Sequence, residues 1–268
     1  MRLAYRREGR GPLLVCHPGG PGFSGSSLTD LGGLADSFEC LVVDPRGTGS
    51  SPAADTFSQE EYVADLEELR AELGLEQFDL LGHSHGGFVA TQYAATHPDR
   101  VRRLVLVTTA PRFSSDYTAA IDAVWDASSD PTFAPAREAR AQRLSSTELE
   151  PDEFVRLAMI ELRLFFARAN GMPVMGQVFM REPPNLAALM YFNRETAPHF
   201  DLRPLLPAIS AQTLVLTGDH DFFGKLAADD LAAGIDDARV VVLADAGHYI
   251  WIDQPQAFAS EVATFLSQ

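Results

Sequence analysis

The chain has 268 residues, of which 46% are apolar and 22% charged, and these proportions are typical of a folded globular protein. Its 37 acidic and 21 basic residues give a formal charge of -16. This charge repels phosphate backbones and anionic lipid headgroups, so neither nucleic acid nor a membrane is expected as a partner.

The beginning of the chain, Met1 to Tyr5, is not followed by an uninterrupted apolar core, so we expect no secretory signal. No apolar run approaches the roughly 18 residues that a membrane span requires. The only two cysteines, Cys16 and Cys40, lie inside apolar runs and are expected to be buried free thiols. The predicted location is therefore the cytoplasm.

Six short apolar runs rich in Val and Leu predict the strands of a sheet. Their apolar character is continuous rather than alternating, which is typical of parallel strands that are covered on both faces. The runs are PLLVCH at 12–17, FECLVVD at 38–44, FDLLG at 78–82, RRLVLVT at 102–108, TLVLTG at 213–218 and RVVVLAD at 239–245.

Helical patterns lie between these runs. Ser58 and Glu61 form a capping-box signature, and apolar residues follow at helical spacing until Gly74. Two further helices are predicted from Phe88 to Thr96 and from Ala257 to Leu266. Strands that alternate with helices predict an α/β fold with a mostly parallel, doubly wound sheet.

The segment 111–206 contains helix-like patterns and clustered prolines but no convincing strand. We predict that it is a helical cap inserted over the carboxyl edge of the sheet, where open α/β sheets bind ligands. The predicted core then consists of residues 1–110 and 207–268.

The motif G-x-S-x-G occurs at 82–86, as GHSHG. A serine in a glycine-rich bend is commonly a turn residue or a helix N-cap. Here a predicted strand precedes the motif and a predicted helix follows it, which is the context of a nucleophile elbow. We therefore predict that Ser84 is a catalytic nucleophile and that the rings of His83 and His85 line a pocket.

A serine nucleophile requires a base, and the base requires an acidic partner. His248 follows a predicted strand and is the best candidate base. Asp219 and Asp221 both follow the preceding strand, and one of them is a candidate cap for the helix near Gly224. We favour Asp221 as the acid.

Two backbone amides are predicted to form an oxyanion hole. One belongs to His85, the residue after the nucleophile. The other is assigned to Gly20 in the loop CHPGGPGFSGSS at 16–27, since Pro21 has no N–H. No cofactor or metal is expected, because the histidines lack zinc-like spacing and no H-E-x-x-H motif occurs.

The ordered motifs GGPG, DPRGTGSS, GHSHGG, GDHD and GHYIWIDQP resemble those of the α/β-hydrolase superfamily, and within it the prolyl iminopeptidase group of serine peptidases. The resemblance implies the same triad of Ser84, Asp221 and His248. In that group cap carboxylates hold the free amine of the substrate, which nominates Glu161 and, less strongly, Glu195. Asp44 and Arg46 of the second motif are expected to brace their loop through an internal ion pair.

The sequence thus predicts a serine hydrolase acting through an acyl-enzyme on a small-molecule or short-peptide substrate. The resemblance implies an aminopeptidase that releases an N-terminal residue. The alternatives are a carboxylesterase, lactonase or carbon–carbon bond hydrolase with the same triad, and a ligand-sensing receptor that retains it. The oligomeric state is not predicted.

Overall fold

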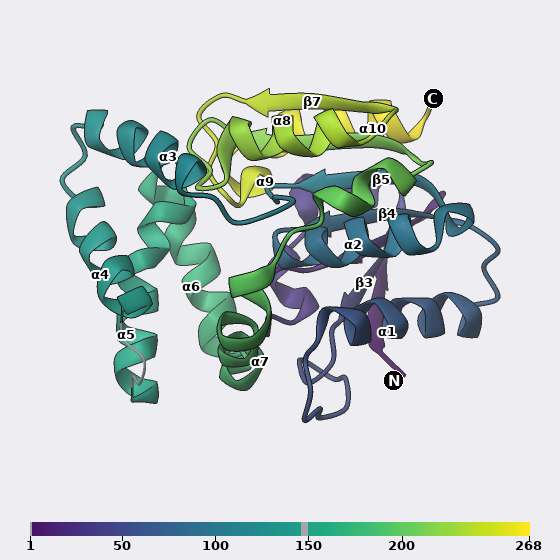
Figure 1. The fold of residues 1–268 in the computed structure, drawn as a ribbon, viewed down its shortest axis with the longest axis horizontal. Helices are drawn as coiled ribbons and strands as arrows, with labels where there is room; N and C mark the ends of the chain where they lie inside the picture. The colour runs from purple at the N-terminus through teal and green to yellow at the C-terminus, as the bar shows by residue number, and fades with distance from the viewer. Residues whose placement is uncertain (1, 146–149) are drawn as a thin grey trace.

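The computed structural model describes residues 2–145 and 150–268, which form a seven-stranded sheet with helices on both faces (Figure 1). The strand order is β1-β3-β2-β4-β5-β6-β7, and only the pair β1 and β3 is antiparallel. The strands are β1 (Ala4–Glu8), β2 (Leu13–His17), β3 (Glu39–Asp44), β4 (Phe78–His83), β5 (Val101–Val107), β6 (Gln212–Gly218) and β7 (Ala238–Leu243).

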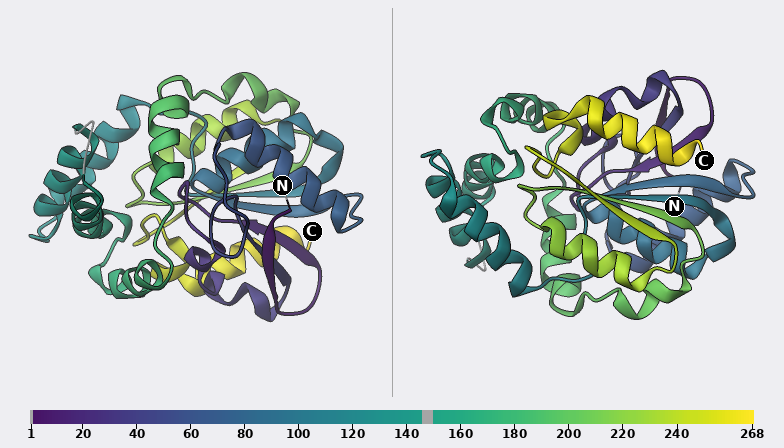
Figure 2. Two further views of the ribbon diagram at one scale, coloured as in Figure 1. Left: turned by 90° about the horizontal axis from the view of Figure 1, so that it is seen from below. Right: turned by 90° about the horizontal axis from the view of Figure 1, so that it is seen from above.

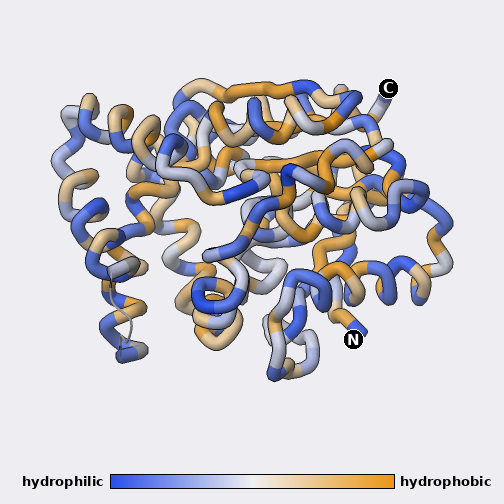
Figure 3. The backbone as a smooth tube through the Cα atoms, viewed as in Figure 1, coloured by the Kyte–Doolittle hydropathy of each residue, from blue (hydrophilic) through white to orange (hydrophobic). Residues whose placement is uncertain are grey.

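All six predicted strands are present, and the predicted α/β class is confirmed. Neighbouring residues of one strand enter opposite halves of the core. Leu14 and Val42 pack in one apolar cluster, whereas Val15 and Leu41 pack in the other. Both sides of each strand are therefore buried, which explains the continuous apolar runs. Figure 3 shows this apolar character along the sheet.

Strand β1 was not predicted. It reads AYRRE, and three of its five residues are exposed. As an antiparallel edge strand, it pairs only with β3 and requires no apolar run. Its charged side chains suit an edge that faces solvent.

Helices α1 (Gln59–Glu72), α2 (His85–Thr96) and α8 (Gly224–Gly234) cover one face of the sheet. Helices α9 (Ile250–Asp253) and α10 (Pro255–Leu266) cover the other face (Figure 2, right). The predicted capping box is confirmed, because Ser58 accepts from the Glu61 amide and Glu61 accepts from the Ser58 amide. The predicted helices that end at Thr96 and Leu266 are α2 and α10.

Between β5 and β6 the described residues contain helices and one isolated bridge, Arg112 with Asp201, but no strand. Most of this segment stands at the end of the sheet toward which the β7 arrow points (Figure 1). Its helices are α3 (Ser115–Ala127), α4 (Phe133–Ser145), α5 (Pro151–Glu161), α6 (Met172–Arg181) and α7 (Leu186–Tyr191). We keep the name cap for residues 111–206, and its boundaries stay a prediction.

Asp44 and Arg46 do not form the ion pair that the sequence suggested. Asp44 instead accepts from the backbone amides of Gly25 and Ser50, each at 2.9 Å. The Arg46 guanidinium donates to Asp65 of α1 at 2.7 Å, and both of these side chains are buried. The loop after β3 is therefore held to α1 by a buried charge pair.

In the described part of the chain, no helix is long and apolar enough to cross a bilayer.

Replacing Arg46 by methionine should lower the free energy of unfolding by about 3–5 kcal/mol, because Asp65 loses its buried counter-charge. Adding Asp65→Leu should recover much of this loss, since no buried carboxylate then remains. Urea denaturation of both variants checks the prediction. A loss below about 1 kcal/mol for Arg46→Met would contradict it.

Candidate active site

Ser84 occupies a strained backbone position between β4 and α2. Its φ of 53° and ψ of -119° lie outside the regions that residues with a side chain normally adopt. A Cβ at Gly82 would lie 2.4 Å from the Gly86 carbonyl oxygen, and one at Gly86 would lie 2.4 Å from the His17 carbonyl oxygen. Both flanking positions therefore require glycine.

Hydrogen bonds hold this turn in place. The Ser84 amide donates to the Val107 carbonyl of β5 at 3.0 Å, and the Ser84 carbonyl accepts from the Thr109 hydroxyl at 2.8 Å. Ser84 stands at the N-cap position of α2, but its hydroxyl makes no capping hydrogen bond. The hydroxyl instead borders a cavity, so the N-cap alternative does not describe this side chain.

Asp221 and His248 are in direct contact. The Nδ1 of His248 donates to Asp221 Oδ1 at 2.7 Å, and both side chains are buried. The other oxygen of Asp221 accepts from the Thr217 hydroxyl and from the Gly224 amide at the start of α8. Asp221 thus contacts the candidate base and also caps a helix.

Asp219 points elsewhere. Its carboxylate accepts from the His220 ring at 2.7 Å and from the Ala246 amide at 3.2 Å. The structure therefore brings Asp221, and not Asp219, to the candidate base. A carboxylate can only accept, so the proton of neutral His248 lies on Nδ1, and Nε2 keeps a lone pair that can take a proton.

The backbone of His248 is fixed from three sides. Its carbonyl accepts from the His83 ring at 3.1 Å and from the Thr108 hydroxyl at 2.9 Å. Its amide donates to the Phe165 carbonyl at 2.8 Å. The Phe222 ring stacks on the imidazole with centroids 4.1 Å apart. These contacts orient the imidazole in the wall of the cavity that Ser84 also lines.

The two flanking histidines of the motif differ in position. The His83 ring lines the cavity, as expected. The His85 ring does not line it and packs instead against Tyr62 and Phe192, with centroids 4.9 and 5.4 Å away. The His85 amide lies at the N-terminus of α2, and the oxyanion role of that amide stays a prediction.

Gly20, the second predicted oxyanion donor, lines the same cavity at a φ of 120°. Its loop lies close to the nucleophile, since a Cβ at Gly19 would come within 3.0 Å of the Ser84 Cβ. Among the backbone hydrogen bonds of the described residues, none is donated by the Gly20 or His85 amide. Both amides thus remain available to a ligand at Ser84.

The cavity has a volume of about 660 Å³ and is walled mainly by apolar side chains of the cap and the core. Such a wall suits a small, largely apolar ligand. The aromatic lining includes Phe23, Phe88, Phe113, Phe165, Phe179 and Phe192.

Among the residues that the structure describes, no cluster of three or more His, Cys, Asp or Glu side chains is suited to a metal ion.

The two cap carboxylates have different positions. Glu161 lines the cavity, but both of its oxygens accept from Arg143 of α4, at 2.5 and 2.9 Å. Glu195 is exposed, pairs with Arg194 and does not line the cavity. Arg143 and Arg140 also line the cavity. The sequence gives no signal for either of them, because arginines on an amphipathic helix usually face solvent.

The chain belongs to the α/β-hydrolase fold family, whose model matches residues 12–255. A proline iminopeptidase of Pestalotiopsis fici is 28% identical over 277 residues, covering 100% of this chain and 96% of its own. A 2-hydroxymuconate semialdehyde hydrolase of a Pseudomonas species is 30% identical over 262 residues, covering 96% and 87%. The crystal structure of an enol-lactonase from Burkholderia xenovorans has a TM-score of 0.75 and 27% identity, covering 99% and 96%. The predicted superfamily and a general hydrolase activity are confirmed.

Asp221→Asn should lower kcat for an activated ester by about 10³- to 10⁴-fold, because the amide no longer fixes the Nδ1–H tautomer of His248. Asp219→Asn is the matched control and should retain activity within about threefold, since that side chain is exposed and lies away from the imidazole. Steady-state hydrolysis of 4-nitrophenyl butyrate measures both. Comparable losses in the two variants would refute the assignment of the acid.

Burial should make the fold sensitive to acid. It lowers the pKa of His17 to about 4 and that of His85 to about 3, against about 6.5 in an unfolded chain. At pH values between these lowered pKa values and about 6.5, the two histidines bind protons in the unfolded chain but not in the folded chain. The free energy of unfolding should therefore fall as the pH decreases from about 6.5 toward 4, by up to about 1.4 kcal/mol per pH unit for each histidine.

Urea denaturation between pH 4.5 and 7.5 tests this dependence on single variants. His85→Phe removes one buried imidazole from an aromatic environment and should flatten the slope of stability against pH. His199→Asn is the control, because His199 is exposed, and it should keep the wild-type slope. If both variants gave the wild-type slope, burial of His85 would not be a source of the acid sensitivity.

Proposed function

We propose that this protein is a serine hydrolase that cleaves carboxylic esters of small, largely apolar acids through an acyl-enzyme. The observation that carries the proposal is the buried Asp221–His248 hydrogen bond in the wall of the cavity that holds the strained Ser84. Its position at the carboxyl edge of the sheet matches the usual ligand site of open α/β folds.

In the proposed reaction, His248 Nε2 takes the proton of the Ser84 hydroxyl while the oxygen attacks the ester carbonyl. Asp221 stabilises the imidazolium that forms. The amides of Gly20 and His85 donate to the oxyanion of the tetrahedral intermediate. As that intermediate collapses, His248 protonates the departing alcohol. Water, activated by the same imidazole, then hydrolyses the acyl-enzyme.

The aminopeptidase hypothesis has less support from the cavity. A free N-terminal ammonium is bound most strongly by a carboxylate that has no other counter-charge. Glu161 is held by Arg143 in a two-point ion pair, and Glu195 lies outside the cavity. Aminopeptidase activity remains the second candidate function, because a proline iminopeptidase is similar over the whole chain and the GGPG loop occurs here.

A substrate panel distinguishes the two candidates. We expect turnover of 4-nitrophenyl esters of acetic to octanoic acid and little turnover of proline 4-nitroanilide. Ser84→Ala should lower ester hydrolysis by about 10⁴-fold or more. A fluorophosphonate should label Ser84, as checked by peptide mass spectrometry.

Other results of these experiments would favour a different function or refute the proposed nucleophile. Faster cleavage of the anilide than of the esters would favour the aminopeptidase. Labelling of a different residue would refute the proposed nucleophile. A single turnover without release of the acyl group would favour a ligand-sensing receptor.

A further inference from the structure

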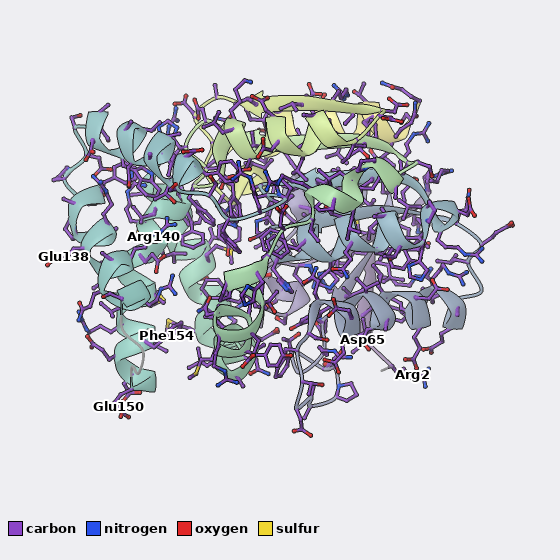
Figure 4. The ribbon with its side chains drawn as sticks, in the orientation of Figure 1. Arg2, Asp65, Glu138, Arg140, Glu150 and Phe154 are labelled. Carbon is purple, nitrogen blue, oxygen red and sulfur yellow. The ribbon has the colours of Figure 1, made fainter. Side chains whose placement is uncertain are left out.

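Arg140 of α4 is a cation inside the candidate active-site cavity. Its side chain is half-buried and lines the cavity together with Ser84 and His248. Figure 4 shows Arg140 on the side of α4 that faces the sheet, whereas Glu138 of the same helix points away from it. The guanidinium stays protonated in proteins, so it brings a full positive charge to this wall.

No carboxylate of the described residues forms an ion pair with Arg140, although the charges of Glu161, Asp122 and Asp221 act on it. In residues 2–145 and 150–268, its guanidinium donates no hydrogen bond and forms no ion pair; it lies against the rings of Trp125 and Phe222, 5.6 and 5.3 Å from their centroids. Neighbouring cap arginines are paired: Arg137 with Asp122 and Asp126, and Arg143 with Glu161. Because Arg140 lines the cavity, its N–H groups can donate to a ligand that binds there.

The unpaired guanidinium is close to the proposed chemistry. The Arg140 guanidinium lies over the Phe222 ring, 5.3 Å from its centroid. The same ring stacks on the His248 imidazole, with centroids 4.1 Å apart. The cation and the candidate base thus touch the same aromatic ring. Ser84 and Arg140 line the same cavity, so one ligand can contact both.

The charge balance of the lining favours an anion. Its ionised side chains are Arg140, Arg143 and Glu161, and the last two neutralise each other in their two-point pair. The charge of Arg140 therefore remains unpaired in a mainly apolar wall, and the buried carboxylate of Asp221 lies behind the His248 imidazole. The net charge of -16 belongs mainly to the surface, where solvent ions screen it over about 8–10 Å.

We propose that Arg140 binds a free carboxylate of the substrate, so that the protein hydrolyses half-esters of dicarboxylic acids. A planar guanidinium matches a carboxylate with two parallel hydrogen bonds. This inference rests on the proposed ester hydrolysis. The bond between the carbonyl carbon and the alkoxy oxygen breaks, and water supplies the new C–O bond. The alcohol leaves with a proton, and the dicarboxylate is released.

The test compares two esters of equal size. Mono-4-nitrophenyl adipate carries a free carboxylate, and 4-nitrophenyl adipamate carries a neutral amide in its place. For the wild-type protein we expect kcat/KM to be at least about tenfold higher for the carboxylate ester. Arg140→Met should lower kcat/KM for that ester by roughly 10- to 100-fold, mainly through KM, and change the value for the amide ester by less than about threefold.

Arg137→Met is the matched control, because Arg137 also belongs to α4 but is paired outside the cavity. It should leave the preference between the two esters unchanged. Arg140→Lys, which keeps the charge but loses the fork geometry, should retain an intermediate preference. Thermal denaturation checks that each variant folds. If Arg140→Met does not fold, the Arg140→Lys result decides, and an unchanged wild-type preference there would overturn the proposal.

Failure of the inference differs from failure of the proposed function. If the wild-type protein hydrolysed neither this pair nor simple 4-nitrophenyl esters, the ester hydrolase proposal would fail. If it hydrolysed both adipate esters equally well, or if Arg140→Met slowed both to the same extent, carboxylate recognition would be overturned. Arg140 would then only support the packing of Trp125 and Phe222.

Discussion

The strained turn at Ser84 is the constraint on which the rest of the site depends. A residue with a side chain adopts a φ of 53° here only because the surrounding sheet over-determines its position. Val107 and Thr109 hold its backbone from the neighbouring strand and the loop after it. Glycine at 82 and 86 removes the side chains that would collide with the turn. The hydroxyl is thereby directed into the cavity instead of capping α2.

Much of this arrangement could be predicted because parallel strands end at one edge. The order of Ser84, Asp221 and His248 along the chain places each residue after a different strand, so the sheet brings them to the same rim. The choice between Asp219 and Asp221 could not be made from spacing alone. Both follow β6, and only the path of the loop before α8 decides which carboxylate meets the imidazole.

The electrostatics of the cap lay beyond sequence analysis. Glu161 could be nominated from a motif, but its neutralisation by Arg143 depends on how α4 packs against α5, which no short pattern encodes. Arg140 lies three residues earlier on the same helix and has no motif at all. The net charge of the chain does not indicate the charge of the cavity, because the acidic excess lies mainly at the surface whereas the cavity lining includes the unpaired Arg140.

An unpaired guanidinium in an apolar cavity is an effective basis for selectivity. Apolar walls distinguish substrates that differ by a methylene group only weakly, by about 1–3 kcal/mol. A polar group in the binding site weakens the binding of every ligand that buries it without a hydrogen-bond partner. The correct ligand supplies that partner. In the free protein, the half-buried Arg140 guanidinium lies against two aromatic rings and is not paired with a carboxylate of the described residues. A ligand that displaces water from this guanidinium without offering it an acceptor would bind weakly, so the unpaired charge would select a ligand that carries a carboxylate.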